Sequence, residues 1–330
     1  MTKEPLLTVV VPTYNAAKDL PTCLEKLYAQ TRPIRILIAD DGSTDATAQI
    51  ADEAAAAHPE VVRVAHFPHV GATSARKAAV PSVSTPYLAF LDADDALETT
   101  FAETMLEVAE RQDADMVFCP YVCVYDGIAR HVSYEGDGAA FARDVHPIRK
   151  TPSLLLTVPV FFWGKLFRTD YFLAHCDFAS EDSASLADVP TILPLLIDMP
   201  RIAKVAEPLY RYSISSNSMC RVSKQELIRL AAMRTLHRRL EAMGALPAFL
   251  PQLHAINRCY LFDQLEKLGG YCDPVHQHRV VREYFRHLDG TLPHWRPHPF
   301  HPTFYAAYWH GVVTWNAAKT WWRARGRKQK

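Results

Sequence analysis

The sequence lacks the glycine-rich loops by which two large classes of nucleotide-binding protein hold phosphates. No Gly-x-Gly-x-x-Gly pattern follows the first apolar run, and no Gly-x-x-x-x-Gly-Lys-Ser/Thr loop occurs in the 330 residues. These absences argue against a dinucleotide-binding Rossmann domain and against a P-loop NTPase. Nucleotide binding by this chain would therefore depend on other groups, among them a bound metal ion.

Cysteine and histidine patterns typical of zinc sites are also absent. The seven cysteines are scattered without a Cys-x-x-Cys pair, and the fifteen histidines form no His-Glu-x-x-His pattern. A zinc site is therefore not expected. Free thiols in a reducing cytoplasm are the simplest explanation of an odd number of cysteines.

Long apolar runs and an excess of one charge are missing as well. No stretch approaches the roughly 20 apolar residues that a membrane-spanning helix needs, and we expect no signal peptide. Lys and Arg together number 36, as do Asp and Glu, so no overall field favours nucleic acid as a partner. An apolar content of 49% is typical of a globular protein with a full hydrophobic core.

Strand-like and helix-like segments alternate through the first 120 residues. Runs of β-branched apolar residues indicate strands, and apolar residues at helical spacing indicate the helices between them. The alternation predicts an α/β fold with a mostly parallel central sheet flanked by helices. The expected strands are 6–11, 34–39, 61–65, 87–91 and 116–119, and the expected helices are 20–28, 46–57, 71–80 and 101–111.

Polar side chains suited to binding a nucleotide lie at the expected strand ends. Tyr14 follows the first strand, Asp41 the second and Asp92 and Asp94 the fourth, while Arg76 lies on the preceding helix. Ligands of open α/β sheets bind beyond the carboxyl ends of the strands, so we expect these side chains to meet in one crevice. An aromatic ring can stack on a base, carboxylates can bind a base and a metal, and arginine can pair with phosphate.

The acidic loop after the fourth strand has two interpretations when it is considered alone. Asp92 and Asp94 directly follow a fully apolar run, where they could hold Mg²⁺ or Mn²⁺ together with a nucleotide. The loop could equally be solvated, with Asp95 as the N-cap of a helix that begins near Ala96. The N-cap role fits Asp95 in either case.

Several short motifs in the first 120 residues occur in the same order and at similar spacing in one known protein family. Residues 10–15, 39–45, 71–77 and 90–95 resemble motifs of family 2 of the inverting glycosyltransferases, which have the GT-A fold. The resemblance implies that Asp92-Ala93-Asp94 is the family's Asp-x-Asp motif. One departure is the segment after Arg76, where Lys77-Ala78-Ala79 replaces the family's Asn-x-Gly.

The resemblance also implies roles for the matched residues. Tyr14 and Asp41 would contact the nucleotide base, typically uracil, in a pocket lined by Pro12. Arg76 would lie near the base and the diphosphate, and Asp92 would face the ribose. Asp94 would bind the cofactor, Mn²⁺ or Mg²⁺, which would bridge the diphosphate.

The expected glycosyltransferase domain covers residues 1–215, with a nucleotide-sugar half at 1–120 and an acceptor half at 121–215. Residues 121–151 contain several glycines and predict a loop-rich segment. The segment 161–168 resembles a family motif beside the acceptor site, with Gly164 in place of Asn. Trp163 and Lys165 would then lie on the acceptor side, although an apolar strand and turn that place Trp163 in the core would explain the segment equally well.

An inverting transfer needs a general base near the acceptor hydroxyl group. In the family this base is usually the Asp of a Glu-Asp pair, and Glu181-Asp182 is a literal match. However, counting back from Glu207-Pro-Leu-Tyr places the pair at Ala187-Asp188. We therefore favour Asp188 as the base and keep Asp182 as the alternative. Asp188 could also cap the helix that begins at residue 189.

Residues 216–330 are expected to form a helical C-terminal extension. Leucines at helical intervals between residues 224 and 243 indicate a helix with a core face. After Asp289 the sequence has no acidic residue, and residues 304–330 mix aromatic with basic side chains. Such a tail suits peripheral contact with an anionic membrane surface, but a helix docked on the body with a solvated end fits it equally well.

Together these features predict a metal-dependent inverting glycosyltransferase. It would move a sugar from a nucleotide-sugar donor, most simply UDP-linked, to a saccharide, polymer or lipid-linked acceptor. The expected location is the cytoplasm or the inner face of the cell membrane, in polysaccharide or envelope glycoconjugate synthesis. Two alternatives are a non-catalytic protein with a decayed donor site and a nucleotidyltransferase of similar fold.

Overall fold

The computed structural model describes residues 4–125, 128–132, 148–179, 187–214, 228–253 and Ile256. The chain divides into two units, of which the first comprises Met1–Val222 and Ala231–Gln252. The second comprises Ser223–Leu230 and Leu253–Lys330, and it lies almost entirely outside the described residues.

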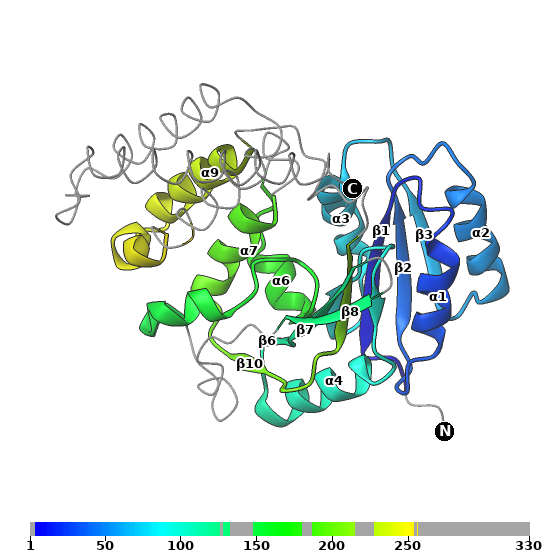
Figure 1. The fold of residues 1–330 in the computed structure, drawn as a ribbon, viewed down its shortest axis with the longest axis horizontal. Coiled ribbons are helices and arrows are strands. Elements are labelled where there is room, and N and C mark those ends of the chain that lie inside the picture. The colour runs from blue at the N-terminus through cyan, green and yellow to red at the C-terminus, as the bar shows by residue number, and fades with distance from the viewer. Residues whose placement is uncertain are drawn as a thin grey trace, which may run out of the picture. The chain divides into compact units, whose positions relative to one another are not determined.

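A seven-stranded sheet forms the centre of the first unit (Figure 1). Its strand order is β10-β6-β9-β4-β1-β2-β3, and every neighbouring pair is parallel except those that β9 makes with β4 and β6. The strands are β1 (Leu7–Thr13), β2 (Arg35–Asp40), β3 (Val62–His66), β4 (Tyr87–Phe90), β6 (Met116–Phe118), β9 (Lys165–Arg168) and β10 (Ile202–Lys204).

This sheet confirms the predicted α/β class with a mostly parallel centre. All seven residues of β1 are buried, as are all four of β4, which is the pattern of strands covered on both faces. The order reverses at β1, because the chain proceeds outward to β2 and β3 and then returns to β4 on the other side. Ligands of doubly wound sheets bind at such a reversal, beyond the carboxyl ends of the strands.

Helices cover both faces of the sheet (Figure 1). Helices α1 and α2 lie on one side of β1–β3 and α3 on the other, as right-handed crossovers require when the chain reverses direction. The helices are α1 (Leu20–Tyr28), α2 (Thr47–Ala57), α3 (Ala72–Ala79), α4 (Phe101–Gln112), α6 (Thr169–His175), α7 (Asp188–Ile197) and α9 (Ile228–Ala242). Short 3₁₀ turns are η1 (Val80–Ser82), η2 (Ile148–Lys150) and η3 (Pro152–Thr157).

A second sheet of four strands was not expected from the sequence. Its order is β5-β11-β7-β8, with β5 (Ala96–Leu97), β7 (Tyr121–Tyr125), β8 (Ile128–Val132) and β11 (Tyr210–Ile214). The prediction of a loop-rich segment at 121–151 is therefore wrong for its first part, where β7 and β8 form an antiparallel pair. β7 also pairs with β11, which is remote in the sequence.

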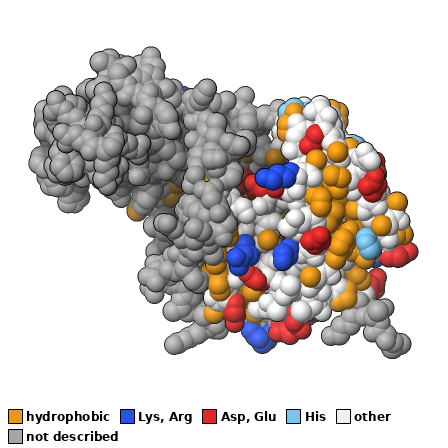
Figure 2. Space-filling view, turned by 45° about the vertical axis from the view of Figure 1, so that its right-hand side comes forward, with side chains coloured by type: hydrophobic (Ala, Val, Ile, Leu, Met, Phe, Trp, Pro, Cys, Tyr) orange, Lys and Arg blue, Asp and Glu red, His pale blue; other side chains and the backbone are white. Residues whose placement is uncertain are grey.

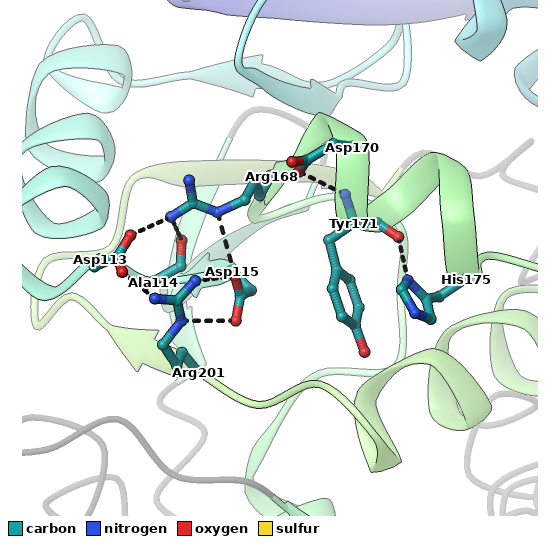
Figure 3. A network of polar contacts seen from close by, with 8 residues as sticks. All are labelled: Asp113, Ala114, Asp115, Arg168, Asp170, Tyr171, His175 and Arg201. Atoms are coloured by element: carbon teal, nitrogen blue, oxygen red, sulfur yellow. Dashed lines mark hydrogen bonds and ion pairs between the residues drawn. The ribbon is translucent and has the colours of Figure 1, made fainter.

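A cluster of ion pairs links β6, β9 and β10 at the end of the large sheet where its parallel strands begin (Figure 3). Asp115 precedes β6 and is buried, with 4% of its side chain exposed, and it accepts hydrogen bonds from Arg168 at the end of β9 and Arg201 before β10. The exposed Asp113 pairs with the same two arginines. Charge-assisted bonds of this kind hold β6, β9 and β10 in register.

The beginning of the predicted C-terminal extension belongs to the first unit. Residues Ala231–Gln252 group with it, and Arg239 of α9 donates to the carbonyl oxygen atoms of Asp177, Phe178 and Pro190. The predicted boundary at residue 215 and the aromatic and basic tail at 304–330 lie outside the described residues.

The visible surface of the described part carries acidic and basic side chains interspersed with apolar ones (Figure 2). This mixture agrees with the equal numbers of acidic and basic residues. Within the described ranges, no helix combines the length and apolar character needed to cross a membrane.

Candidate active site

The loops that follow β1 and β2 are fastened to each other at the carboxyl edge of the large sheet. Asn15 adopts a left-handed conformation with φ +48°, which asparagine tolerates better than most residues. Its backbone N–H donates to Ser43 Oγ at 3.0 Å, and its Oδ1 accepts from the backbone N–H of Thr44 at 2.8 Å. The tight turn presents the preceding Tyr14 at the surface, where 44% of the residue is exposed.

Asp41, directly after β2, is buried and acts as an acceptor for the chain that enters α3. Its Oδ1 accepts from the N–H of Val70 and its Oδ2 from the N–H of Gly71, both at 2.9 Å. His69 Nδ1 lies 2.8 Å from the same Oδ2, and the imidazole stacks on Tyr14 with ring centroids 3.9 Å apart and planes 12° apart. Tyr14 and Asp41 therefore lie near each other, as predicted. His69, which was not among the predicted site residues, contacts both.

Arg76 on α3 is buried beneath the acidic loop. Its guanidinium group donates to Asp92 Oδ1 and lies over the ring of Phe162, 5.1 Å from the centroid. Burial opposes its charge, but the charges of Asp92 and Asp188 outweigh this effect and raise the pKa of Arg76. A permanently charged guanidinium group thus interacts both with Asp92, which is predicted to face the donor, and with Asp188, the predicted base.

The three carboxyl groups of the acidic loop have different environments. Asp94 is exposed, yet partial removal from water and the charge of Asp92 raise its pKa to about 6. Burial, with the charges of Asp92 and Asp94, raises the pKa of Asp95 to about 9. Such shifts are typical of carboxyl groups that crowd one site.

Asp95 does not cap a helix, so that prediction is wrong. Residues 96–97 form β5, and α4 begins only at Phe101 with Thr100 at its N-cap position. The Asp95 side chain instead turns inward, where it accepts from Tyr210 Oη and from the backbone N–H of Ser213, at 2.7 Å. The bonds to β11 replace the expected contact with the next helix.

Asp188 is the first residue of α7 and lies in the same electrostatic cluster as Arg76 and Asp92. Burial raises the pKa of Asp188, while Arg76 and a hydrogen bond from the backbone N–H of Phe162 act in the opposite direction. Its charge therefore interacts with those of Arg76 and Asp92, and its role as the base stays a prediction. The alternative, Asp182, lies outside the described residues.

Trp163 and Lys165, the two residues predicted for the acceptor side, are both buried. Trp163 stacks on Tyr210 with ring centroids 4.5 Å apart and on Phe161 at 4.4 Å. Lys165 Nζ donates to the carbonyl oxygen of Phe161 at 2.6 Å, and burial lowers the pKa of this amine to about 7. Their assignment to the acceptor side stays a prediction, and their observed contacts are those of a core that supports the turn around Phe162.

Gly164 has a conformational reason to stand where the family motif has Asn. Its φ is +67°, in the left-handed region that glycine and asparagine adopt more readily than other residues. The turn allows the carbonyl oxygen of Gly164 to accept from the N–H of Cys119 at 3.0 Å. This departure from the motif therefore preserves the local backbone.

The family model described as "Glycosyl transferase family 2" matches residues 8–165, which include β1, where the strand order reverses, the acidic loop and the turn at Phe162. Residues 8–165 belong to this family of glycosyltransferases. The resemblance identified from the motifs is confirmed.

The chain is also similar to bacterial glycosyltransferases, and each match covers part of this chain and part of the relative. The "Uncharacterized glycosyltransferase YibD" of Escherichia coli is 40% identical over 114 residues, which are 34% of this chain and 33% of that protein. The "Uncharacterized glycosyltransferase EpsJ" of Bacillus subtilis is 26% identical over 223 residues, which are 66% of this chain and 64% of that protein. The chain thus spans between about one third and two thirds of the length of these relatives.

The fold of the family 2 domain also matches a solved structure. TarS of Staphylococcus aureus, residues 1–349 in complex with UDP-GlcNAc, superposes with a TM-score of 0.64 at 17% identity. The match covers 85% of this chain and 81% of the TarS chain. At an identity of 17% the match establishes the fold alone, which is the GT-A fold.

The carboxylates of the acidic loop could bind a divalent cation that also contacts the phosphates of a nucleotide. Asp94 is exposed and Asp92 has 31% of its side chain exposed, and carboxylate oxygens are the ligands that Mg²⁺ and Mn²⁺ prefer. Among the described residues no group of three or more His, Cys, Asp or Glu side chains forms a ready metal cage. A cation held by one or two carboxylates and completed by phosphates is therefore the arrangement that these residues suit.

Proposed function

We propose that this domain transfers a sugar from a nucleotide-sugar donor to an acceptor hydroxyl group, with inversion at the anomeric carbon. The observation that carries the proposal is the position of Arg76, which is bonded to Asp92 and lies close enough to Asp188 for their charges to interact. A donor-side carboxylate and a candidate base therefore both interact with the buried guanidinium group of Arg76. Such crowding of perturbed titratable groups is a recognised property of active sites.

The chemistry follows from the roles of the two carboxylates. Asp188 would accept the proton of the acceptor hydroxyl group as its oxygen attacks the anomeric carbon, and burial favours this because it raises the pKa of the carboxyl group. Asp92 would contact the ribose of the donor, and Arg76 would contribute positive charge near the diphosphate. A metal ion at Asp94 would neutralise the charge of the departing nucleoside diphosphate.

The base of the nucleotide would lie against Tyr14 and Asp41, with Pro12 below. An exposed aromatic ring beside a buried carboxylate supports this position, because it offers one stacking surface and one acceptor for a base N–H. UDP is the first nucleotide to test, because the TarS structure of the same fold is a complex with UDP-GlcNAc. The acceptor would be a saccharide, polymer or lipid-linked hydroxyl group.

The proposal is tested by calorimetric titration of the full chain with UDP, GDP and CDP, with and without Mn²⁺. We expect UDP to bind in a manner that depends on Mn²⁺, and Asp94→Asn to weaken that binding by at least about tenfold, or about 1.4 kcal/mol. Glu53→Gln, an exposed carboxylate on α2, serves as the matched control. Unchanged UDP affinity in Asp94→Asn would remove the metal assignment.

Turnover separates the proposal from its two alternatives. A glycosyltransferase releases UDP from a UDP-sugar in the presence of an acceptor, and the anomeric configuration of the product is read by NMR. A nucleotidyltransferase would instead form the UDP-sugar from a sugar phosphate and UTP. A protein that binds UDP but catalyses neither reaction would be the non-catalytic alternative.

A further inference from the structure

His69 lies on the two groups that are proposed to receive the nucleotide base. Its imidazole ring is stacked on Tyr14, with planes 12° apart, and its Nδ1 lies 2.8 Å from Asp41 Oδ2. A carboxylate only accepts hydrogen bonds, so the imidazole donates its N–H to Asp41. A flat aromatic ring that stacks on Tyr14 and donates a ring N–H to Asp41 makes the same pair of contacts that a uracil ring would make.

The backbone of this segment is fixed, so only the His69 side chain is free to move away. Gly42 has φ +69°, and a Cβ atom there would lie 2.8 Å from the backbone nitrogen of His69. The N–H of Phe67 donates to the carbonyl oxygen of Asp40, and Asp41 holds the N–H groups of Val70 and Gly71. By contrast, 52% of the His69 side chain is exposed, which leaves it room to turn toward solvent.

Asp41 has little capacity left while His69 is in place. Its two oxygens accept three hydrogen bonds, from His69, Val70 and Gly71, and a carboxylate offers about four acceptor positions. The two backbone donors are part of the folded chain and stay. The bond from the imidazole is therefore the one that an incoming base can replace.

We propose that His69 occupies the base position on Tyr14 and Asp41 and that the nucleotide must displace its imidazole in order to bind. This inference rests on the proposed function, because it assumes a nucleotide at this edge of the sheet. His69 is then a residue that determines affinity: the observed affinity for a nucleotide is the intrinsic affinity reduced by the fraction of molecules in which the position is open. Ligands that lack a base do not meet this competition.

The test compares UDP binding to the full chain and to His69→Ala by calorimetry at fixed free Mn²⁺. We expect His69→Ala to bind UDP about fivefold more tightly, since the competing stack and hydrogen bond are gone. Inorganic pyrophosphate has no base, so its affinity should be equal in the two proteins. His66→Ala is the matched control. His66 lies three residues before His69 but bonds to Asp40 and Asp52, so its replacement is expected to leave UDP affinity unchanged.

A second measurement follows the imidazole itself. The ring NMR signals of His69 are recorded with Mg²⁺, because paramagnetic Mn²⁺ would broaden them, and they are assigned by their absence from His69→Ala. We expect UDP to shift them away from their Asp41-bound positions, while pyrophosphate does not. His69→Asn keeps a hydrogen-bond donor but loses the aromatic ring, so its UDP affinity should fall between those of the wild-type chain and His69→Ala.

The outcomes separate this inference from the proposed function. UDP binding that is equal or weaker in His69→Ala, or unshifted His69 signals at saturating UDP, would overturn the displacement and leave the proposed function intact. If neither the wild-type chain nor His69→Ala bound UDP, GDP or CDP, the nucleotide site itself would be overturned, and this inference with it.

Discussion

Tyr210 on β11 donates a hydrogen bond from its hydroxyl group to the carboxyl group of Asp95 at the end of the acidic loop. Both side chains are buried, and the N–H of Ser213 supplies a second bond to the same carboxyl group. The loop that carries Asp92 and Asp94 is therefore anchored to the second sheet. Its position depends on a strand that lies 115 residues further along the chain.

We expect Tyr210→Phe to lower the free energy of unfolding by about 1–3 kcal/mol, because it removes the partner of a buried polar atom. Chemical denaturation measures the change. Tyr28→Phe is the control, since Tyr28 is exposed and should tolerate loss of its hydroxyl group. Equal stability of Tyr210→Phe and the wild-type chain would mean that the bond contributes no net stabilisation.

Five of the seven strands of the large sheet were predicted, because their signals are local. β1, β2 and β4 are apolar runs buried on both faces, and their predicted ends differ from the observed ends by no more than two residues. The second sheet has no such signal. β5 has two residues and β11 three partly exposed ones, so pairing with each other and with β7 determines these strands.

The candidate site was also predictable only in part, because some of its residues depend on contacts with partners remote in the sequence. Residues at the strand ends could be proposed because the fold fixes where those ends meet. Asp188 was proposed by counting from a motif, and its role as the base stays a prediction. The roles of His69 and Asp95 depend on partners remote in the sequence, Tyr14 and Tyr210. A histidine before a helix and an aspartate after a strand have common local explanations, so neither residue could be assigned from its neighbours alone.

Asp115 offers a test of stability that is separate from ligand binding, because it precedes β6 and so lies at the end of the sheet away from the carboxyl ends of the parallel strands. We expect Asp115→Asn to lower the free energy of unfolding by about 2 kcal/mol, since it weakens a buried acceptor shared by Arg168 and Arg201. Asp113→Asn should cost less than about 1 kcal/mol, because 69% of that side chain is exposed.

UDP affinity should be unchanged in both of these variants, which calorimetry would measure beside chemical denaturation. A loss of UDP binding in folded Asp115→Asn would contradict the separation of this edge from the donor site.

Lys165 should make stability depend on pH, with a sign that follows from its burial. Burial lowers the pKa of its amine from 10.5 to about 7 in the folded chain. Between these values the unfolded chain binds more protons than the folded chain, so the free energy of unfolding from this group rises with pH. The slope is at most about 1.4 kcal/mol per pH unit for one proton.

The measurement is the difference in unfolding free energy between the wild-type chain and Lys165→Met at several values between pH 7 and pH 10. We expect this difference to change in favour of the wild-type chain as the pH rises. Lys26→Met removes an exposed amine and should show no such trend. A difference that is independent of pH would mean that the amine is charged in the folded chain across the whole range.

Asp188 is the residue on which the transfer chemistry depends most directly. Asp188→Asn keeps the size of the side chain and its capacity to accept the N–H of Phe162, but it cannot take a proton from an acceptor hydroxyl group. We expect UDP affinity within about twofold of the wild-type value and turnover reduced by about 10²-fold or more, in line with the usual contribution of a general base. Calorimetry and UDP release from the UDP-sugar measure the two quantities. Asp198→Asn, at the opposite end of α7 and paired with Arg149, is the control that should retain turnover. Turnover near the wild-type value in Asp188→Asn would exclude this carboxylate as the base and make Asp182 the next residue to replace.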